Sequence, residues 1–316
     1  MATTTITQEA LATPSAPSGL IPKPSGPNKL FSKPDAKYGD FRDDLLRDGF
    51  CVVKGAIPRD RADQYAEEMY KYVETFKGGL GFKRDDPSTW VEKNMPVINE
   101  KGIYSVAHES FTWAVRQEPG AIDAFSKVYD TDDLIVSFDG VNLAFPRKDL
   151  KPNTPWPHQD QGPEKPGFRC LQGLVNLLPN GDNDGGLIVC KGAHLLSEEF
   201  HAEFKDELDK IWAWTKECQC RARRFDPLGL SDAARFCIYT CYMPVADATQ
   251  EELVRKKYAL ETTQSTTHWP NAMHIGGVPI NRQDGKPCPH NDWNPRQPVK
   301  LTERGLRLTG IPYIKA

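Results

Sequence analysis

The segment Trp156-Pro-His-Gln-Asp-Gln-Gly162 places an imidazole and a carboxylate two residues apart. On a strand, side chains at positions i and i+2 share one face, so His158 and Asp160 are predicted to project together. Held in this way, they supply two ligands of the 2-His-1-carboxylate triad, which binds Fe(II) and leaves positions open for substrate-like ligands and dioxygen. The same spacing also occurs in ordinary surface pairs, so the metal interpretation depends on the surrounding sequence.

Helices are predicted from periodicity and capping signals. One follows Pro58, where apolar residues recur at the spacing of a single helix face as far as Phe76. Another begins at Ser197, and a third begins with the capping-box sequence Thr249-Gln-Glu-Glu252.

Short strands are predicted over much of the remaining chain, separated by clusters of Gly, Pro, Asn and Asp. Their ranges are 50–54, 134–138, 141–145, 170–177, 186–190 and 236–242. Because no β-α-β alternation and no internal repeat is present, a doubly wound sheet is disfavoured. The predicted fold class is mainly β with flanking helices (α+β), as a barrel or sandwich decorated by helices.

Composition divides the 316 residues into two parts. Six prolines fall in the first 34 residues among Ser, Thr and Gly, so residues 1–36 are predicted to be a disordered leader. Residues 37–316 are predicted to form a single domain. A net charge of −3 argues against a nucleic-acid partner, and no stretch approaches the roughly 20 apolar residues of a membrane helix.

Cysteine usage and the termini bear on location. The N-terminus lacks a secretory pattern, the C-terminal Ile314-Lys-Ala316 is not a peroxisomal signal, and eight cysteines are too few for a disulfide scaffold. The chain is therefore expected to be cytoplasmic with reduced thiols. The oligomeric state cannot be read from the sequence.

Four further segments accompany the His158–Asp160 pair and carry a resemblance to a known family. They read Asp48-Gly-Phe-Cys-Val-Val-Lys-Gly55, Gly185-Gly-Leu-Ile-Val-Cys-Lys-Gly-Ala-His194, Arg235-Phe-Cys-Ile-Tyr-Thr-Cys-Tyr-Met-Pro244 and Thr267-His-Trp-Pro270. From about residue 41 to residue 269 the chain resembles the phytanoyl-coenzyme-A dioxygenase family of Fe(II)- and 2-oxoglutarate-dependent oxygenases. The resemblance implies a double-stranded β-helix, that is, a jelly-roll or cupin-like fold.

The resemblance also implies roles for individual residues. His158 and Asp160 match the first two iron ligands, and Arg235 matches the arginine that pairs with the distal carboxylate of 2-oxoglutarate. A planar, permanently charged guanidinium suits that pairing; a surface salt bridge is the alternative for Arg235. His194 is expected to close its turn by hydrogen bonding rather than to bind metal.

The family needs a second histidine, on a strand of the form Gly-Asp-x-x-x-Trp-Asp-Ser-Arg-Thr-x-His shortly before the arginine. Residues 220–234 occupy that place and contain no histidine. One set of synonymous codons for residues 220–233, read one base out of frame, encodes Ala-Glu-Pro-Gly-Asp-Ser-Ile-Leu-Trp-Asp-Ser-Arg-Thr, which reproduces the absent motif. We interpret residues 220–234 as frame-shifted or mis-spliced, so that one late strand is missing. His268 is a weak substitute ligand, because moving a ligand would require the site to be rebuilt.

The resulting prediction is an oxidoreductase: a dioxygenase that uses Fe(II) and 2-oxoglutarate to hydroxylate or otherwise oxidise a small organic substrate. Succinate and CO2 are the implied co-products, and ascorbate is a candidate reductant. One alternative is an inactive jelly-roll protein that binds a ligand or partner, because the distal histidine is missing. Another is a jelly-roll metalloenzyme that uses His158 and Asp160 without 2-oxoglutarate.

Overall fold

The computed structural model describes residues 3–5, 19–22, 33, 35–96, 98, 103–104, 106–147, 149, 160, 171–181, 187, 189–203, 234–271, 281–290 and 294–315. Helices in these residues are α2 (Phe41–Asp48), α3 (Arg59–Thr75), α4 (Ser110–Arg116), α5 (Pro119–Tyr129), α6 (Ser197–Glu203), α8 (Gln250–Glu261) and α9 (Glu303–Leu308). Short 3-10 turns are η1 (Phe76–Gly78), η2 (Pro87–Thr89), η3 (Glu92–Asn94), η4 (Ala193–Leu196), η6 (Val245–Asp247) and η7 (Ile311–Tyr313). Strands are β1 (Thr3–Thr5), β2 (Ile103–Tyr104), β3 (Leu134–Val136), β4 (Val141–Ala144), β5 (Leu174–Asn176), β6 (Arg235–Tyr239), β7 (Tyr242–Pro244) and β8 (Lys300–Thr302).

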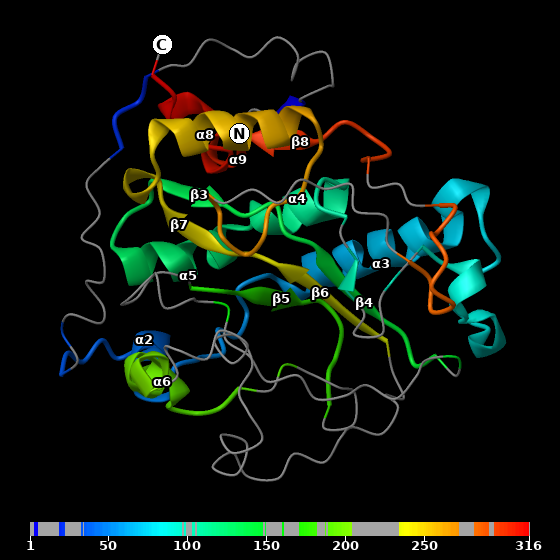
Figure 1. Cartoon of the computed structure of the whole chain (residues 1–316), viewed down its shortest axis with the longest axis horizontal. Helices are drawn as coiled ribbons and strands as arrows, with labels where there is room; N and C mark the ends of the chain where they lie inside the picture. The colour runs from blue at the N-terminus through cyan, green and yellow to red at the C-terminus, as the bar shows by residue number, and fades with distance from the viewer. Residues whose placement is uncertain are drawn as a thin grey trace.

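The central sheet has the strand order β2-β4-β6-β5, and every neighbouring pair is antiparallel (Figure 1). Strand β6 lies in the middle, between β4 and β5. Its residue Cys237 pairs with Asn142 of β4 on one side and with Asn176 of β5 on the other. This register places the three side chains on the same face of the sheet.

The opposite face of this sheet is apolar and fully buried. Val141 and Leu143 of β4, together with Phe236 and Ile238 of β6, are inaccessible to solvent. They join one hydrophobic cluster with the inward face of α3, which lies beside the sheet in Figure 1. The helix predicted after Pro58 is therefore confirmed, and its apolar face packs on the sheet because alternation along the strands presents apolar residues there.

Strands β3 and β4 continue one another, as do β6 and β7, and the two long segments run antiparallel. The pairing changes between them, since residues 137–140 on one segment face only residues 239–241 on the other. The first segment thus carries one extra residue, which makes this a β-bulge. Bulges occur often beside functional sites, because they redirect side chains that regular pairing would fix.

A second part of the core lies around α5, α8 and α9, where Trp113, Ile122 and Leu301 are fully buried. Helix α8 begins with the predicted capping box. The hydroxyl of Thr249 accepts a hydrogen bond from the backbone N–H of Glu252, and the carboxylate of Glu252 accepts one from the backbone N–H of Thr249. Strands β1 and β8 pair in the same region (Figure 1). Most of the predicted leader lies outside the described residues.

Several predicted strands differ from the structure. Residues 50–54 form no strand, and Val52 is 72% exposed, because this segment has no neighbouring strand within the described residues to satisfy its backbone. Residues 187, 189 and 190 are not in a strand either. The range 236–242 is divided into β6 and β7 at Thr240 and Cys241. The sheets are small and do not close within the described part of the chain, so the jelly roll stays a prediction.

No helix in the described part of the chain has the length and apolar character required to cross a bilayer.

Candidate functional site

The side of the central sheet that faces away from α3 is polar. We call it the polar face, and define it by Asn142, Asn176, Arg235, Cys237 and Tyr239. Asn142 and Cys237 are buried, Arg235 and Tyr239 are half-buried, and Asn176 is exposed. The polar face therefore combines hydrogen-bonding side chains with graded access to solvent, and we take it as the candidate site.

A chain of hydrogen bonds runs along the polar face. Arg235 donates from Nε and Nη2 to Oδ1 of Asn142, at 3.3 and 3.1 Å. Asn142 in turn donates from Nδ2 to the hydroxyl oxygen of Tyr239, at 3.4 Å. The amide of Asn142 therefore lies between the guanidinium and the phenol, which are four residues apart on β6.

Arg235 makes no ion pair with a carboxylate among the residues that the structure describes; the oxygen it contacts belongs to an uncharged amide. Cys237 lies next to it along the same face, and burial raises the pKa of this thiol to about 11, an effect that the Arg235 charge opposes. Burial likewise raises the pKa of Tyr239, whereas its hydrogen bond from Asn142 lowers it. At neutral pH the polar face thus carries one cation beside neutral groups.

Asp139 lies in the β-bulge, at the Tyr239 end of the polar face. Burial raises the pKa of its carboxyl above the ordinary value, and the charge of Asp160 raises it further. The Gly140 N–H, which donates to Asp139 Oδ1 at 2.7 Å, acts in the opposite direction, as do the charges of Arg116 and His268. These influences show that Asp139, Asp160 and His268 lie in one neighbourhood.

Asp160 is placed by a hydrogen bond from Gln172, whose Nε2 donates to Oδ2 at 2.7 Å. Gln172 immediately precedes Gly173, whose carbonyl accepts from the backbone N–H of Thr240 at the end of β6. Asp160 itself lies in a bend and not in the strand that the sequence predicted. His158 lies outside the described residues, so the prediction that the two side chains project together stays open.

His268 has a buried Nε2 with no hydrogen-bonding partner. Its ring packs against Trp269, with ring centroids 5.9 Å apart. An imidazole nitrogen in this state is a possible ligand atom, yet no group of three metal-binding side chains occurs among the described residues. His194 forms a hydrogen bond, as predicted, but not within its own turn: its Nε2 lies 3.1 Å from the carbonyl oxygen of Leu46 and ties the turn to α2. Residues 220–233 lie outside the described residues.

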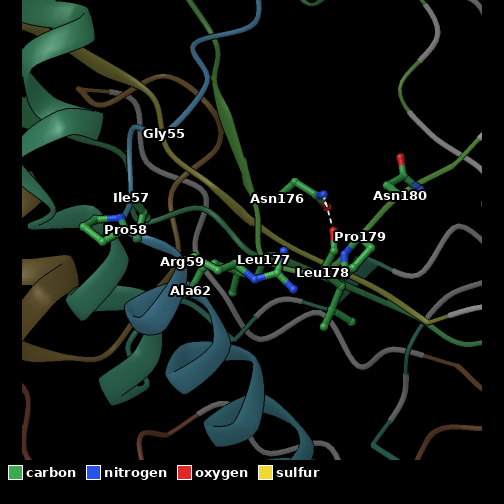
Figure 2. Close-up of a pocket in the computed structure, with 10 residues that line it drawn as sticks. All are labelled: Gly55, Ile57, Pro58, Arg59, Ala62, Asn176, Leu177, Leu178, Pro179 and Asn180. Carbon is green, nitrogen blue, oxygen red and sulfur yellow. Dashed lines mark hydrogen bonds between the residues drawn. The ribbon is translucent and has the colours of Figure 1, made fainter.

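A hollow of about 420 Å³ opens where α3 begins and β5 ends. Figure 2 shows its described lining residues: Gly55, Ile57, Pro58, Arg59, Ala62, Asn176, Leu177, Leu178, Pro179 and Asn180. The charged member, Arg59, donates to Asp63 one turn along α3, and Asn176 donates to the carbonyl of Leu178. These described residues mix apolar side chains with Arg59 and two asparagines, and include no thiol, imidazole or carboxylate; Asn176 also belongs to the polar face.

The sequence named Arg235 and Asp160 as candidates but did not name the polar side chains that the structure places near them, Asn142, Tyr239 and Asp139. Tyr239 was detectable, because it follows Arg235 by four residues on a strand and so shares its face. Asn142 and Asp139 required the register of β4 against β6 and the position of the bulge, which local sequence does not determine.

Comparison with known proteins gives one informative relative, Ava biosynthesis cluster protein O of Aspergillus versicolor. It is 36% identical over 274 residues, which cover 75% of this chain and 88% of the relative. No family model matches the chain, and no solved structure matches it.

At this identity and coverage, the chain belongs to the same family as Ava biosynthesis cluster protein O.

Proposed function

We propose that this chain has the jelly-roll scaffold of an Fe(II)- and 2-oxoglutarate-dependent oxygenase that acts on a small organic molecule. In this proposal His158 and Asp160 bind the iron, and Arg235 binds the distal carboxylate of 2-oxoglutarate. The observation that carries it is the state of Arg235, a half-buried guanidinium on the polar face whose hydrogen-bond acceptor among the described residues is an amide rather than a carboxylate.

The physical basis is the cost of partly burying a cation without a counter-ion. Hydrogen bonds to an amide oxygen replace only part of the lost hydration, so an anionic ligand would be bound favourably at this position. A carboxylate matches the planar guanidinium better than a spherical anion does, because two parallel N–H···O bonds can form.

The other end of the polar face has donors that suit Fe(II). Asp160 supplies a carboxylate there, and the unpartnered Nε2 of His268 shows an unsatisfied polar atom in the same neighbourhood. Iron and 2-oxoglutarate, when bound, would activate dioxygen as the oxidant, with one oxygen atom going to the substrate and the other to succinate, and CO2 released. The residues of the chain would orient the co-substrate between Arg235 and Asp160.

The relative's name places it in a biosynthesis cluster, which supports a role for this chain in biosynthesis. A cytoplasmic location, as the sequence predicts, is part of the proposal.

The second candidate is an inactive jelly-roll protein that keeps the carboxylate site but not the metal site. One observation favours it: residues 220–234 contain no histidine. In that case Arg235 still binds a dicarboxylate.

The test combines metal analysis with product analysis on the full chain. Anaerobic loading with Fe(II) is followed by measurement of iron content, then of succinate formation with and without 2-oxoglutarate. Iron uptake that Asp160→Ala removes, together with succinate that Arg235→Ala removes, supports the oxygenase. Dicarboxylate binding without iron uptake supports the inactive protein, and iron uptake without any effect of 2-oxoglutarate supports a different metalloenzyme.

A further inference from the structure

The guanidinium of Arg235 is held by one edge. Of its five N–H groups, the Nε–H and one Nη2–H point at the same oxygen, Oδ1 of Asn142. This contact occupies the side-on edge of the fork and leaves the end-on pair, formed by Nη1 and the second Nη2–H, for another acceptor. Asn142 therefore determines which edge of Arg235 a carboxylate can reach.

The same amide acts on Tyr239. Because Nδ2 of Asn142 donates to the phenolic oxygen, that oxygen already accepts one hydrogen bond. Among the described residues, no acceptor is found for the hydroxyl hydrogen of Tyr239. The phenol is thus prepared to donate to a ligand on the polar face.

Asn142 is suited to this role because it cannot move easily. It is 2% exposed, and its backbone is held in β4 between β2 and β6. The register opposite Cys237 places its amide between Arg235 and Tyr239. A buried amide with bonds on both its oxygen and its nitrogen is fixed in orientation as well as in position.

We infer that Asn142 is the positioning residue of the carboxylate site: it presents the end-on fork of Arg235 and the Tyr239 hydroxyl as donors to one dicarboxylate ligand. The inference rests on the proposed function, since it concerns how the same polar face binds 2-oxoglutarate. The ligand would extend along β6, with one carboxylate at Arg235 and its remaining length beside Tyr239, towards Asp160.

An isosteric substitution separates this role from a purely structural one. Asn142→Asp keeps the shape and still accepts from Arg235, but it supplies the negative charge that the ligand would otherwise supply. The fold should persist, but the aspartate should neutralise Arg235, so that an anionic ligand binds less favourably. Asn176→Asp is the matched control: Asn176 pairs with the other side of Cys237, so the substitution adds the same charge to the same face, but at an exposed position two strand spacings (about 10 Å) from Asn142.

Binding of 2-oxoglutarate and of glutarate to the full chain, without added metal, is measured by calorimetry. Asn142→Asp should weaken both by roughly 10- to 100-fold, the scale of a lost charge-assisted hydrogen-bond pair. Asn176→Asp should weaken them by about threefold or less, because Asn176 is exposed and solvent screens a charge there. Tyr239→Phe should cost about three- to tenfold, the scale of one neutral hydrogen bond. Equal losses in the two aspartate variants would overturn the inference.

A ligand-free readout keeps this result distinct from failure of the proposed function. The Nε–H of Arg235 should give a slowly exchanging NMR signal in the unsubstituted chain, and Asn142→Ala should broaden or remove it while Asn176→Ala leaves it unchanged. A signal that depends on Asn142, without any dicarboxylate binding, would refute the proposed co-substrate and with it the ligand named here. Dicarboxylate binding through Arg235 with a signal indifferent to Asn142 would refute only the positioning role.

Discussion

His108 accepts a hydrogen bond on Nδ1 from the indole Nε1–H of Trp113, at 3.2 Å, while its Nε2 lies 2.8 Å from the backbone oxygen of Gln264. These contacts define a neutral ring that donates from Nε2 and accepts at Nδ1. The side chain is 1% exposed. Burial lowers the pKa of His108 to about 3, and the charges of Arg116 and Lys256 lower it as well, although the Gln264 contact raises it.

This arrangement predicts acid lability. Between about pH 6.5 and pH 3 the unfolded chain binds a proton at His108 that the folded chain excludes, so stability falls by up to about 1.4 kcal/mol per pH unit as pH decreases through that window. Above pH 6.5 this contribution is constant. Urea unfolding at pH 7.5, 6 and 5 should show a shallower pH dependence for His108→Gln than for the unsubstituted chain. His290→Gln is the control, and a common slope for all three proteins would contradict the prediction.

Substitutions of Arg235 should weaken dicarboxylate binding in a graded way. Arg235→Ala removes the cation and its end-on fork, and should weaken 2-oxoglutarate by roughly 10- to 100-fold. Arg235→Lys keeps a charge but lacks the planar fork, so it should recover only part of the affinity. Calorimetry measures the affinity of each variant for 2-oxoglutarate. Arg59→Ala, in the neighbouring hollow, should leave affinity unchanged, because its described partner is Asp63; an equal loss there would mean that the site was assigned to the wrong arginine.

Local signals predicted the elements whose stabilisation is local. Helix α3 follows from the periodicity after Pro58, and α8 follows from the capping box at Thr249, because both depend on residues within a few positions. The strand pattern gave β4 and most of β6 for a similar reason: each buries one alternating apolar face.

The strand predictions were wrong where a strand depends on a distant segment to pair with. Residues 50–54 have strand-like composition but no partner strand within the described residues, and the interruption at Thr240 and Cys241 exists because the opposing segment has one residue more. For the same reason Arg235 was readable from its own sequence, whereas its contact with Asn142, 93 residues away, was not.

His268 provides a test of the substitute ligand. A buried nitrogen without a partner costs about 1–3 kcal/mol, so His268→Phe should raise the free energy of unfolding by about 1 kcal/mol if this nitrogen binds nothing. Iron uptake should then stay unchanged. Both are measured on the full chain, by chemical unfolding and by metal analysis. Loss of iron uptake in His268→Phe, or robust succinate production abolished by His268→Ala, would instead show that the third ligand has moved to this position.

The chain as it stands is predicted to bind iron weakly and to turn over little or no 2-oxoglutarate. Losing one partner that only orients a metal ligand typically costs roughly 10- to 100-fold in affinity or activity, so losing a ligand itself should cost more.

Replacing residues 220–233 with Ala-Glu-Pro-Gly-Asp-Ser-Ile-Leu-Trp-Asp-Ser-Arg-Thr, followed by the motif's intervening residue and a histidine, should restore iron binding and turnover of 2-oxoglutarate. The control carries alanine in place of that histidine, which separates recovery of the strand from recovery of the ligand. Iron content and succinate yield are compared for the three proteins, and sequencing of the transcript across residues 215–236 tests the origin of the segment: a clean in-frame message would show that it is authentic. Equal iron uptake by the repaired chain and its alanine control would show that the restored histidine is not the missing ligand.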